Sequence, residues 1–271
     1  MVAAALALAS LAAALPAPAE ECLYLVGGQN LGLDVRQGSI WYSIPTGDRG
    51  ELYPFEVVVA EEGKAFVSYQ RFGRPGQVVE VDLVSRTVGR VFDVGSGRRM
   101  AYANGKVYIP NPEEGTLTAI DVASGDKREV SGPWARAPEL VAAAGDGSAV
   151  FAGISNLVAP GATRVYVVDT ETDEVATSFS TGLYTEIAAH GSTVLVAAAG
   201  VIRAFEEGDR GYVKAWEADG GGISWALEVA GGRVFSAIVG LGAPLFDVSL
   251  APPHVVAVHY FILGPQVEQL L

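Results

Sequence analysis

The sequence has few of the residues that build cross-links and metal cages: among 271 residues there is one cysteine, Cys22, and there are three histidines, His190, His254 and His259. A single cysteine excludes an intramolecular disulfide and a zinc site built from several thiolates. The histidines lack the spacing of metal ligands, which favours structural or surface positions. The sequence also lacks a Gly-x-Ser-x-Gly elbow, a phosphate loop and a His-Glu-x-x-His motif. These absences favour a protein that is not an enzyme.

Positive charge is also scarce, because 18 Lys and Arg face 31 Asp and Glu, giving a formal net charge of −13 and a pI of about 4.6. Such a surface repels phosphates, so we expect no nucleic-acid partner and no binding to an anionic membrane surface. Arg outnumbers Lys by 14 to 4, and Met and Cys are both scarce, with two Met and one Cys. This pattern is typical of a thermophile or of GC-rich codons, and both readings stay open.

The longest uncharged apolar run, "VAAALALASLAAAL" at residues 2–15, is shorter than a membrane span, so we expect no transmembrane segment. It matches the hydrophobic region of a secretory signal, with Ala17 and Ala19 as a small-x-small cleavage site before Glu20. Residues 1–19 are therefore expected to be a signal peptide, and the protein to be extracytoplasmic, either secreted or at the cell surface. No Lys or Arg precedes the run, so an Ala-rich helical extension that mediates self-assembly remains an alternative.

Half of the residues are hydrophobic, and 33 Gly with 14 Pro indicate many turns, which favours an all-β chain. A repeat runs through this part: a glycine precedes an apolar strand in "GKAFVSY", "GKVYIP", "GSAVFAG", "GSTVLVA" and "GRVFSAI", at Gly63, Gly105, Gly147, Gly191 and Gly232. "ECLYLVGG" adds a sixth copy. Four short strands per period of about 42 residues are typical of a propeller blade. We therefore predict one domain, residues 20–271, that forms a six-bladed β-propeller of four-stranded blades.

Two further features belong to the repeat. An aspartate is expected to end the third strand of five copies and to accept backbone N–H groups of the next turn, at Asp34, Asp82, Asp121, Asp169 and Asp247. The fifth copy departs from this pattern with Glu206. The first copy starts at its second strand, and "GPQVEQLL" at residues 264–271 resembles the inner-strand segment "APELVAAA". We therefore predict that the C-terminal strand joins the first blade, beside residues 22–27, and closes the ring.

The segments "IDVASGDK" and "VDTETDEV" resemble the YVTN and pyrroloquinoline-quinone-type β-propeller repeats. The resemblance covers nearly all of residues 20–271 and implies the fold. Quinone repeats typically read Ala-x-Asp-x-x-Thr-Gly-Lys-x-x-Trp; Ala119, Asp121 and Gly125 match, but Ser124 stands for Thr and Glu129 for Trp. Quinone binding is therefore not implied, and no cofactor is expected.

By analogy with other propellers, ligands bind at the face where the connections between blades and the loops between second and third strands lie. The Arg and aromatic residues expected there are Tyr53, Arg71, Arg98, Arg99, Trp134, Arg136, Tyr184 and Trp225. Arg pairs with carboxylates and rings stack, so this loop face suits a glycan, a peptide or an anionic small molecule. The alternative is that these are ordinary loop residues whose rings anchor the loops.

Three functions follow. The first is a noncatalytic extracytoplasmic propeller that binds a protein, glycan or small-molecule partner through the Arg and aromatic face. The second is a calcium-dependent hydrolase resembling the six-bladed lactonases, with the cation in the central channel on oxygen ligands from Asn111, Glu139, Asn156 and Glu186. The third is a subunit of an extracellular assembly in which residues 1–19 pack between protomers.

Overall fold

The computed structural model describes the chain in fourteen stretches: residues 22–26, 32–37, 40–46, 53–60, 63–71, 74–95, 99–134, 138–154, 163–198, 200–220, 224–230, 233–238, 244–250 and 253–260. In these residues the secondary structure consists of β-strands joined by turns. No helix in the described stretches has the length and apolarity needed to cross a membrane. Residues 1–19 and 264–271, on which two of the predictions depend, lie outside the described residues.

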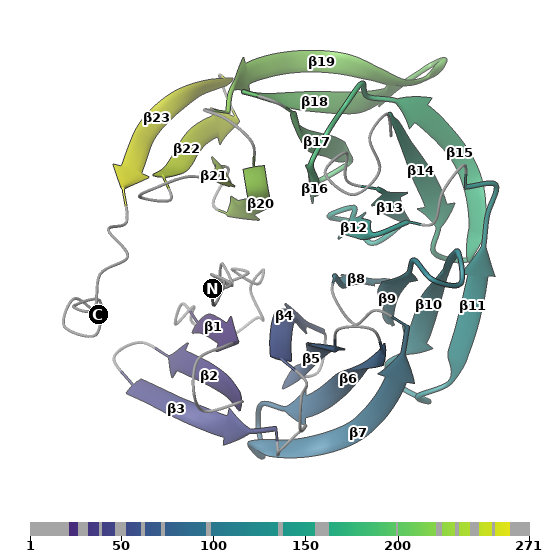
Figure 1. Ribbon diagram of the computed structural model, residues 1–271, viewed down its shortest axis with the longest axis vertical. Coiled ribbons are helices and arrows are strands. Elements are labelled where there is room, and N and C mark those ends of the chain that lie inside the picture. The colour runs from purple at the N-terminus through teal and green to yellow at the C-terminus, as the bar shows by residue number, and fades with distance from the viewer. Residues whose placement is uncertain are drawn as a thin grey trace. The chain divides into compact units, whose positions relative to one another are not determined.

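The described strands form six sheets in chain order, one of three strands and five of four, and within each sheet they lie side by side in the order of the sequence (Figure 1). Sheet 1 contains β1 (Cys22–Val26), β2 (Gly32–Gln37) and β3 (Ile40–Pro45). Sheet 2 contains β4 (Tyr53–Val59), β5 (Lys64–Arg71), β6 (Arg74–Asp82) and β7 (Thr87–Val94). Sheet 3 contains β8 (Ala101–Ala103), β9 (Lys106–Asn111), β10 (Thr116–Asp121) and β11 (Lys127–Ser131).

The second half of the chain continues the same arrangement. Sheet 4 contains β12 (Leu140–Ala143), β13 (Ala149–Gly153), β14 (Arg164–Asp169) and β15 (Glu174–Ser180). Sheet 5 contains β16 (Glu186–His190), β17 (Thr193–Ala198), β18 (Val201–Gly208) and β19 (Gly211–Asp219). Sheet 6 contains β20 (Ser224–Ala230), β21 (Arg233–Ile238), β22 (Pro244–Leu250) and β23 (Pro253–Tyr260). The contacts divide the chain into two compact units, unit 1 with Met1–Gly153 and Tyr166–Ser178, and unit 2 with Ile154–Val165 and Phe179–Leu271.

The backbone conformation explains why glycine recurs in the repeat. Gly63, Gly105, Gly147 and Gly191 have φ angles of 73°, 72°, 72° and 58°, a region in which a β-carbon is unfavourable. Each lies in the tight turn that leads into the second strand of its sheet. In sheet 3 the preceding Asn104 also has a positive φ of 46°, so Asn-Gly forms the primed turn that suits a two-residue hairpin. The prediction of glycine-led second strands is confirmed at these four positions.

The aspartates of the repeat were predicted correctly in three sheets. Asp82, Asp121 and Asp169 are the last residues of β6, β10 and β14. Their Oδ1 atoms accept the backbone N–H groups of Ser85 at 2.7 Å, Ser124 at 2.7 Å and Thr172 at 2.8 Å. These bonds are the main cause that lowers the pKa of each of the three carboxyl groups.

For Asp34 and Asp247 the prediction was wrong. They lie inside β2 and β22, opposite Ser43 and Ala257, because both strands continue for three residues beyond them. Asp34 accepts the Ser43 hydroxyl instead of capping a turn. In the fifth copy, β18 likewise continues past Glu206 to pair Gly208 with Gly211, whose φ is 96°. The copy without the aspartate therefore forms a longer hairpin.

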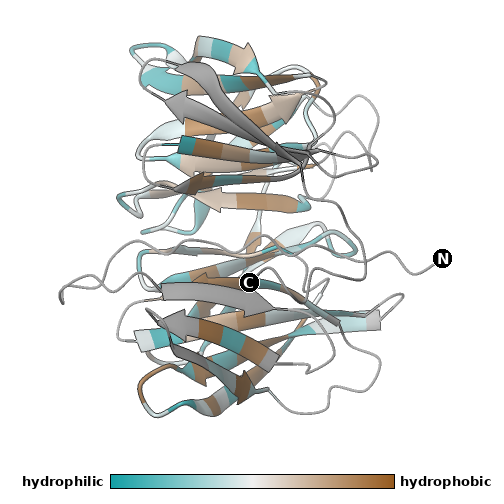
Figure 2. Ribbon diagram, turned by 90° about the vertical axis from the view of Figure 1, so that its left-hand side faces the viewer, coloured by the Kyte–Doolittle hydropathy of each residue, from teal (hydrophilic) through white to brown (hydrophobic). Residues whose placement is uncertain are grey.

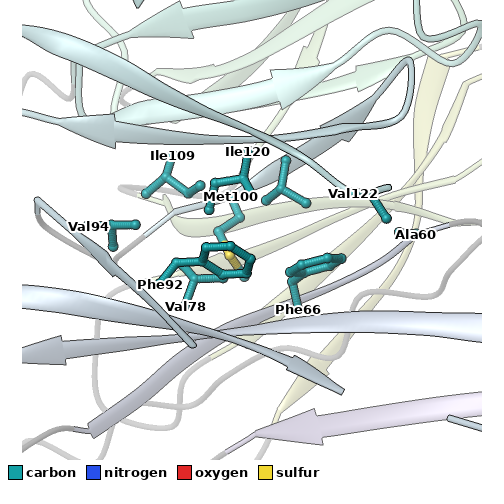
Figure 3. Packing of buried hydrophobic residues seen from close by; sticks show 10 residues of the cluster. Ala60, Phe66, Val78, Phe92, Val94, Met100, Ile109, Ile120 and Val122 are labelled. Atoms are coloured by element: carbon teal, nitrogen blue, oxygen red, sulfur yellow. The ribbon is translucent and has the colours of Figure 1, made fainter. Parts of the chain in front are cut away.

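The core of unit 1 lies between consecutive sheets (Figure 3). Phe66, Val78 and Phe92 of sheet 2 pack with Met100 and with Ile109 and Ile120 of sheet 3, and each is at most 7% exposed. Figure 2 shows that the strands carry hydrophobic residues interrupted by hydrophilic ones. Because consecutive sheets of unit 1 share this core, one of these sheets alone cannot bury its own apolar residues.

Polar contacts also join sheets 3 and 4, where the carboxylate of Asp173 in the turn after β14 is the acceptor. Its Oδ2 lies 2.8 Å from Lys106 Nζ and 3.4 Å from Arg128 Nη1, and its Oδ1 accepts the Tyr108 hydroxyl at 2.7 Å. Lys106 also donates to the Thr170 carbonyl at 2.9 Å. Burial and this carboxylate raise the pKa of Tyr108. We call this group the Asp173 latch.

The equivalent turns of sheets 3 and 2 also contact the sheet that precedes each of them. Arg90 of β7 reaches across to the Val122 carbonyl in the turn after β10, at 2.5 Å. The Arg86 guanidinium carbon in the turn after β6 lies 4.0 Å from the centre of the Tyr42 ring of β3. Sheets 1 to 4 are therefore joined in sequence through one recurrent turn.

Candidate functional site

Three chain segments share one end of sheet 3, and we call this the loop end. They are the connection from β7 to β8, the turn from β9 to β10, and the connection from β11 to β12. In an antiparallel meander the odd and even turns lie at opposite ends, so these three lie at the same end. This is the end at which the sequence predicts ligand binding.

The loop end contains a largely buried ion pair between Glu56 of β4 and Arg99. Arg99 Nη1 lies 3.5 Å from Glu56 Oε1, and the two side chains are 20% and 17% exposed. The backbone N–H of Met100 donates to Glu56 Oε2. The Arg99 guanidinium carbon also lies 5.6 Å from the centre of the Phe55 ring, within the range of a cation–π contact.

The backbone of β4 positions Glu56 for this ion pair. The register between β4 and β5 shifts between Pro54 and Glu56, so Phe55 is the extra residue of a bulge. The Ser68 hydroxyl accepts the Glu56 backbone N–H at 3.1 Å and donates to the Glu56 carbonyl at 3.4 Å. Bulges redirect side chains and are frequent next to functional sites. The bulge therefore gives Phe55 and Glu56 directions that a regular strand would not.

The surroundings of Glu56 shift its pKa. Burial raises the pKa of Glu56, while the Arg99 charge and the Met100 N–H act in the opposite direction. Burial dominates, because removing a carboxylate from water destabilises its charged form. The ionised pair is therefore held at a desolvation cost.

Arg99 was predicted from the sequence as a binding residue, but Glu56 was missed. The signal was a single glutamate inside the otherwise apolar segment "PFEVVV". A charged residue in a strand that packs against other sheets requires a partner, since unpaired buried charge is costly. That argument indicates a buried partner but does not identify Arg99.

The predicted aromatic residues have packing roles where the structure describes them. The Trp134 ring is perpendicular to that of Tyr166, with centres 5.1 Å apart, and it covers Gly132, where a β-carbon would lie 2.6 Å from the ring. The indole N–H of Trp134 is buried and has no hydrogen-bond partner among the described residues. Trp134 therefore belongs to the packing between sheets 3 and 4.

For Tyr184 the expectation of a surface ligand contact needs correction. Tyr184 lies in unit 2 and is 0% exposed. Its hydroxyl accepts the Ile154 N–H at 3.0 Å and donates to the Arg164 carbonyl at 2.7 Å. A buried tyrosine needs such partners for its hydroxyl, so the residue fixes the two ends of the chain segment between β13 and β14.

The remaining predicted binding residues are placed only in part. Tyr53, Arg71 and Trp225 lie in β4, β5 and β20, but their side chains are outside the described part of the structure. Arg98 and Arg136 lie outside the described residues altogether. Their place in a common binding surface stays a prediction.

The described residues place the predicted calcium ligands only in part, and the calcium site stays a prediction. The Asn111 Oδ1 atom accepts the Gly95 N–H at 2.9 Å, and its Nδ2 donates to Thr118 at 2.6 Å and to Glu129 at 3.1 Å. The oxygen expected to bind a cation is therefore used to connect sheets 2 and 3. Glu139 and Glu186 are each 8% exposed and belong to different units, and Asn156 lies outside the described residues. A search of the described stretches finds no group of three or more His, Cys, Asp or Glu arranged to hold a metal.

No family model matches the sequence, and no curated protein matches it. Solved structures do resemble the chain. A chain from the "Crystal Structure of Mitotic Checkpoint Complex" has 12% identity and a TM-score of 0.66 over 90% of this chain and 77% of that one. A chain from the "Structure of U3-55K" has 10% identity and a TM-score of 0.59 over 79% of this chain and 66% of that one.

A third structure, "Kuenenia stuttgartiensis Hydrazine Synthase", has 17% identity and a TM-score of 0.51 over 60% of this chain and 48% of that one. The first two structures are β-propellers of the WD-repeat type. At these identities the likeness shows the fold and not the function. The four-stranded sheets and these structural neighbours together give the chain a β-propeller fold.

Proposed function

We propose that this chain is a noncatalytic binding module, and that it recognises an anionic group of a glycan, peptide or small molecule at the loop end. One observation carries the proposal: Arg99 lies there, partly exposed, over the Phe55 ring. A guanidinium with an aromatic neighbour suits carboxylate, sulfate and phosphate groups. Structural neighbours support a binding role, because one of them comes from a multi-protein complex.

The proposal includes two finer points that come from the sequence. The module is a six-bladed propeller whose sixth blade is joined to the first by the C-terminal segment. It works outside the cytoplasm, since residues 1–19 resemble a secretory signal. A mature protein that begins near Glu20 supports export, and an intact residue 1 in the protein isolated from its host contradicts it and favours the assembly subunit.

Binding is tested by comparing wild-type protein with Arg99→Lys and Arg99→Ala on glycan arrays, acidic peptides and small sulfonates. We expect weaker binding in both variants, because Lys loses the fork geometry and Ala also loses the charge. Arg128→Gln is the matched control, since it removes one positive charge from a 60% exposed side chain at the other end of sheet 3. Equal binding by wild type and Arg99→Ala would overturn the proposal.

The calcium-dependent hydrolase is tested separately by measuring the metal content of dialysed protein and its melting temperature with calcium and with chelator. We expect neither a stoichiometric divalent ion nor a shift, because the Asn111 oxygen is already used by Gly95. One ion per chain, lost together with melting temperature on chelation, would favour the hydrolase and lead to lactone substrates.

A further inference from the structure

Glu56 and an anionic ligand would compete for the same guanidinium. We propose that Glu56 is a proton-controlled gate on an anion site at Arg99: protonated Glu56 opens the site to a sulfate, phosphate or carboxylate group, and ionised Glu56 closes it. The inference rests on the proposed function, since it concerns the regulation of that same site. It adds that binding at the loop end is coupled to uptake of one proton.

The geometry of the pair suits competition. The contact between Arg99 Nη1 and Glu56 Oε1 is 3.5 Å, longer than the roughly 2.7–2.9 Å of a strong charge-assisted hydrogen bond. The second carboxylate oxygen is bound by the Met100 N–H rather than by the guanidinium. A pair with one long contact is easier to replace than a two-point fork, so an external anion can take the place of Glu56.

Among the described side chains, few other charges act on Glu56. The side chains of β1, which also contacts β4, are outside the described part of the structure. Among the described side chains of β5, which pairs with β4, Lys64 lies at the far end of the strand, 3.6 Å from Glu80. Ser68 contacts the Glu56 backbone, and the Tyr69 hydroxyl contacts Thr46. Of the described side chains of β8, Tyr102 is the titratable one. Arg99 is thus the charged group that faces Glu56 in the described part of unit 1.

The charge balance then gives the direction of the effect. With Glu56 ionised, the pair is neutral and an approaching anion meets a carboxylate beside its target. With Glu56 protonated, the buried pair carries a net positive charge and retains the Met100 hydrogen bond. Burial already raises the pKa of Glu56 above its ordinary value. If only the protonated form binds, affinity falls by about tenfold per pH unit above that pKa.

The test uses inorganic sulfate and benzenesulfonate, because neither changes charge between pH 5 and pH 8. Each is titrated into the ¹⁵N-labelled full chain, and binding is read from the Met100 backbone amide and the Arg99 side-chain N–H signals. We expect wild-type affinity to fall steadily as pH rises. Glu56→Gln, which retains an oxygen for Met100, should bind at all pH values as tightly as wild type does at pH 5. Arg128→Gln should behave like wild type.

A second measurement needs no variant, which matters if Glu56→Gln fails to fold. The Glu56 side-chain carboxyl ¹³C signal is followed against pH with and without sulfate. By linkage, an anion that prefers protonated Glu56 must move the midpoint to higher pH, and an unchanged midpoint overturns the gate.

The outcomes separate the two proposals. Sulfate binding that depends on Arg99 but is independent of pH and equal in Glu56→Gln rejects the gate and leaves the binding module standing. Absence of sulfate and sulfonate binding in every variant, including Glu56→Gln at pH 5, rejects the anion site itself.

Discussion

At the scale of single residues, one turn position carries much of the contact between sheets. The fourth residue after Asp82, Asp121 and Asp169 has a positive φ, and it is Arg86, Gly125 and Asp173 respectively. In sheet 4 the side chain at this position receives Lys106, Tyr108 and Arg128 from sheet 3. The residue at this turn position, which ends the turn of its own sheet, therefore also contacts the preceding sheet.

Replacing Asp173 should destabilise unit 1 in a graded way. Asp173→Ala leaves Lys106 and Tyr108 without their acceptor and places alanine at a φ of 58°, so we expect a loss of about 3–5 kcal/mol. Asp173→Asn tolerates the positive φ and retains an oxygen for Tyr108, so it should lose less. Urea denaturation measures both, and equal losses would contradict the latch.

Glu56 predicts an unusual pH dependence of stability. The folded pKa of Glu56 is raised above 4.5, so its contribution to stability is present below about pH 4.5 and is lost as pH rises through the raised value. Relative to Glu56→Gln, wild-type protein should lose stability as pH rises from about 4.5 through the raised pKa, by at most about 1.4 kcal/mol per pH unit. Melting temperatures of the two proteins across this range test it, and parallel curves would refute it.

Residue-level prediction from sequence depended on repetition. Asp82, Asp121 and Asp169 were predictable because the same residue recurs at one place per copy. Glu56 occurs in one copy only, and its partner lies 43 residues away in the chain. A contact of that kind depends on how two sheets pack, and no local pattern records it.

At the scale of elements, the glycines of sheet 3 separate conformational strain from crowding. Gly125 and Gly115 have φ angles of 82° and 71°. A β-carbon on Gly125 would lie 2.3 Å from Arg90 Nη1, whereas one on Gly115 would meet nothing within 4 Å. Both need the left-handed conformation, but only at Gly125 does a side chain from sheet 2 cross the turn.

Gly115→Ala should therefore cost about 1–2 kcal/mol, the price of the left-handed conformation. Gly125→Ala should cost more, because Arg90 must also leave the Val122 carbonyl. In an Arg90→Ala background the two glycine substitutions should cost the same. A double-mutant cycle in urea measures this coupling, and an unchanged difference between the two would show that Arg90 is not responsible.

The predicted strands were most accurate where the turn residues and the 42-residue period indicated the same strand boundary. The second strands after Gly63, Gly105, Gly147 and Gly191 were located within two residues. The predictions ended β2 and β22 too early, at Asp34 and Asp247, because an aspartate can occupy a strand interior when a cross-strand partner such as Ser43 is present.

At the scale of the molecule, the six copies of the repeat in the sequence correspond to six described sheets. Sheet 1 has three described strands, with β1 at its edge. An unpaired edge leaves backbone N–H and C=O groups without partners. The predicted fourth strand, residues 264–271, lies outside the described residues. The fold class was predictable because the 42-residue period is a property of the whole chain, whereas closure depends on a single segment.

Truncation tests the closure. A chain that begins at Glu20 and ends at Tyr260 should melt at least about 5 °C below a chain of residues 20–271. Removal of the predicted closing strand would expose β1 and the core that it packs against to solvent. Starting both proteins at Glu20 removes any effect of the apolar N-terminal segment. Equal melting temperatures would show that the C-terminal residues do not complete sheet 1.

The Asp173 latch also has a consequence for synthesis. Lys106 and Tyr108 leave the ribosome 64 to 67 residues before the groups that bind them. At about 5–20 residues per second, roughly 3–13 s pass between the synthesis of Lys106 and Tyr108 and the synthesis of Thr170 and Asp173, which accept their hydrogen bonds. The residues of sheet 3 that bind the Asp173 carboxylate are therefore synthesised several seconds before Asp173 itself.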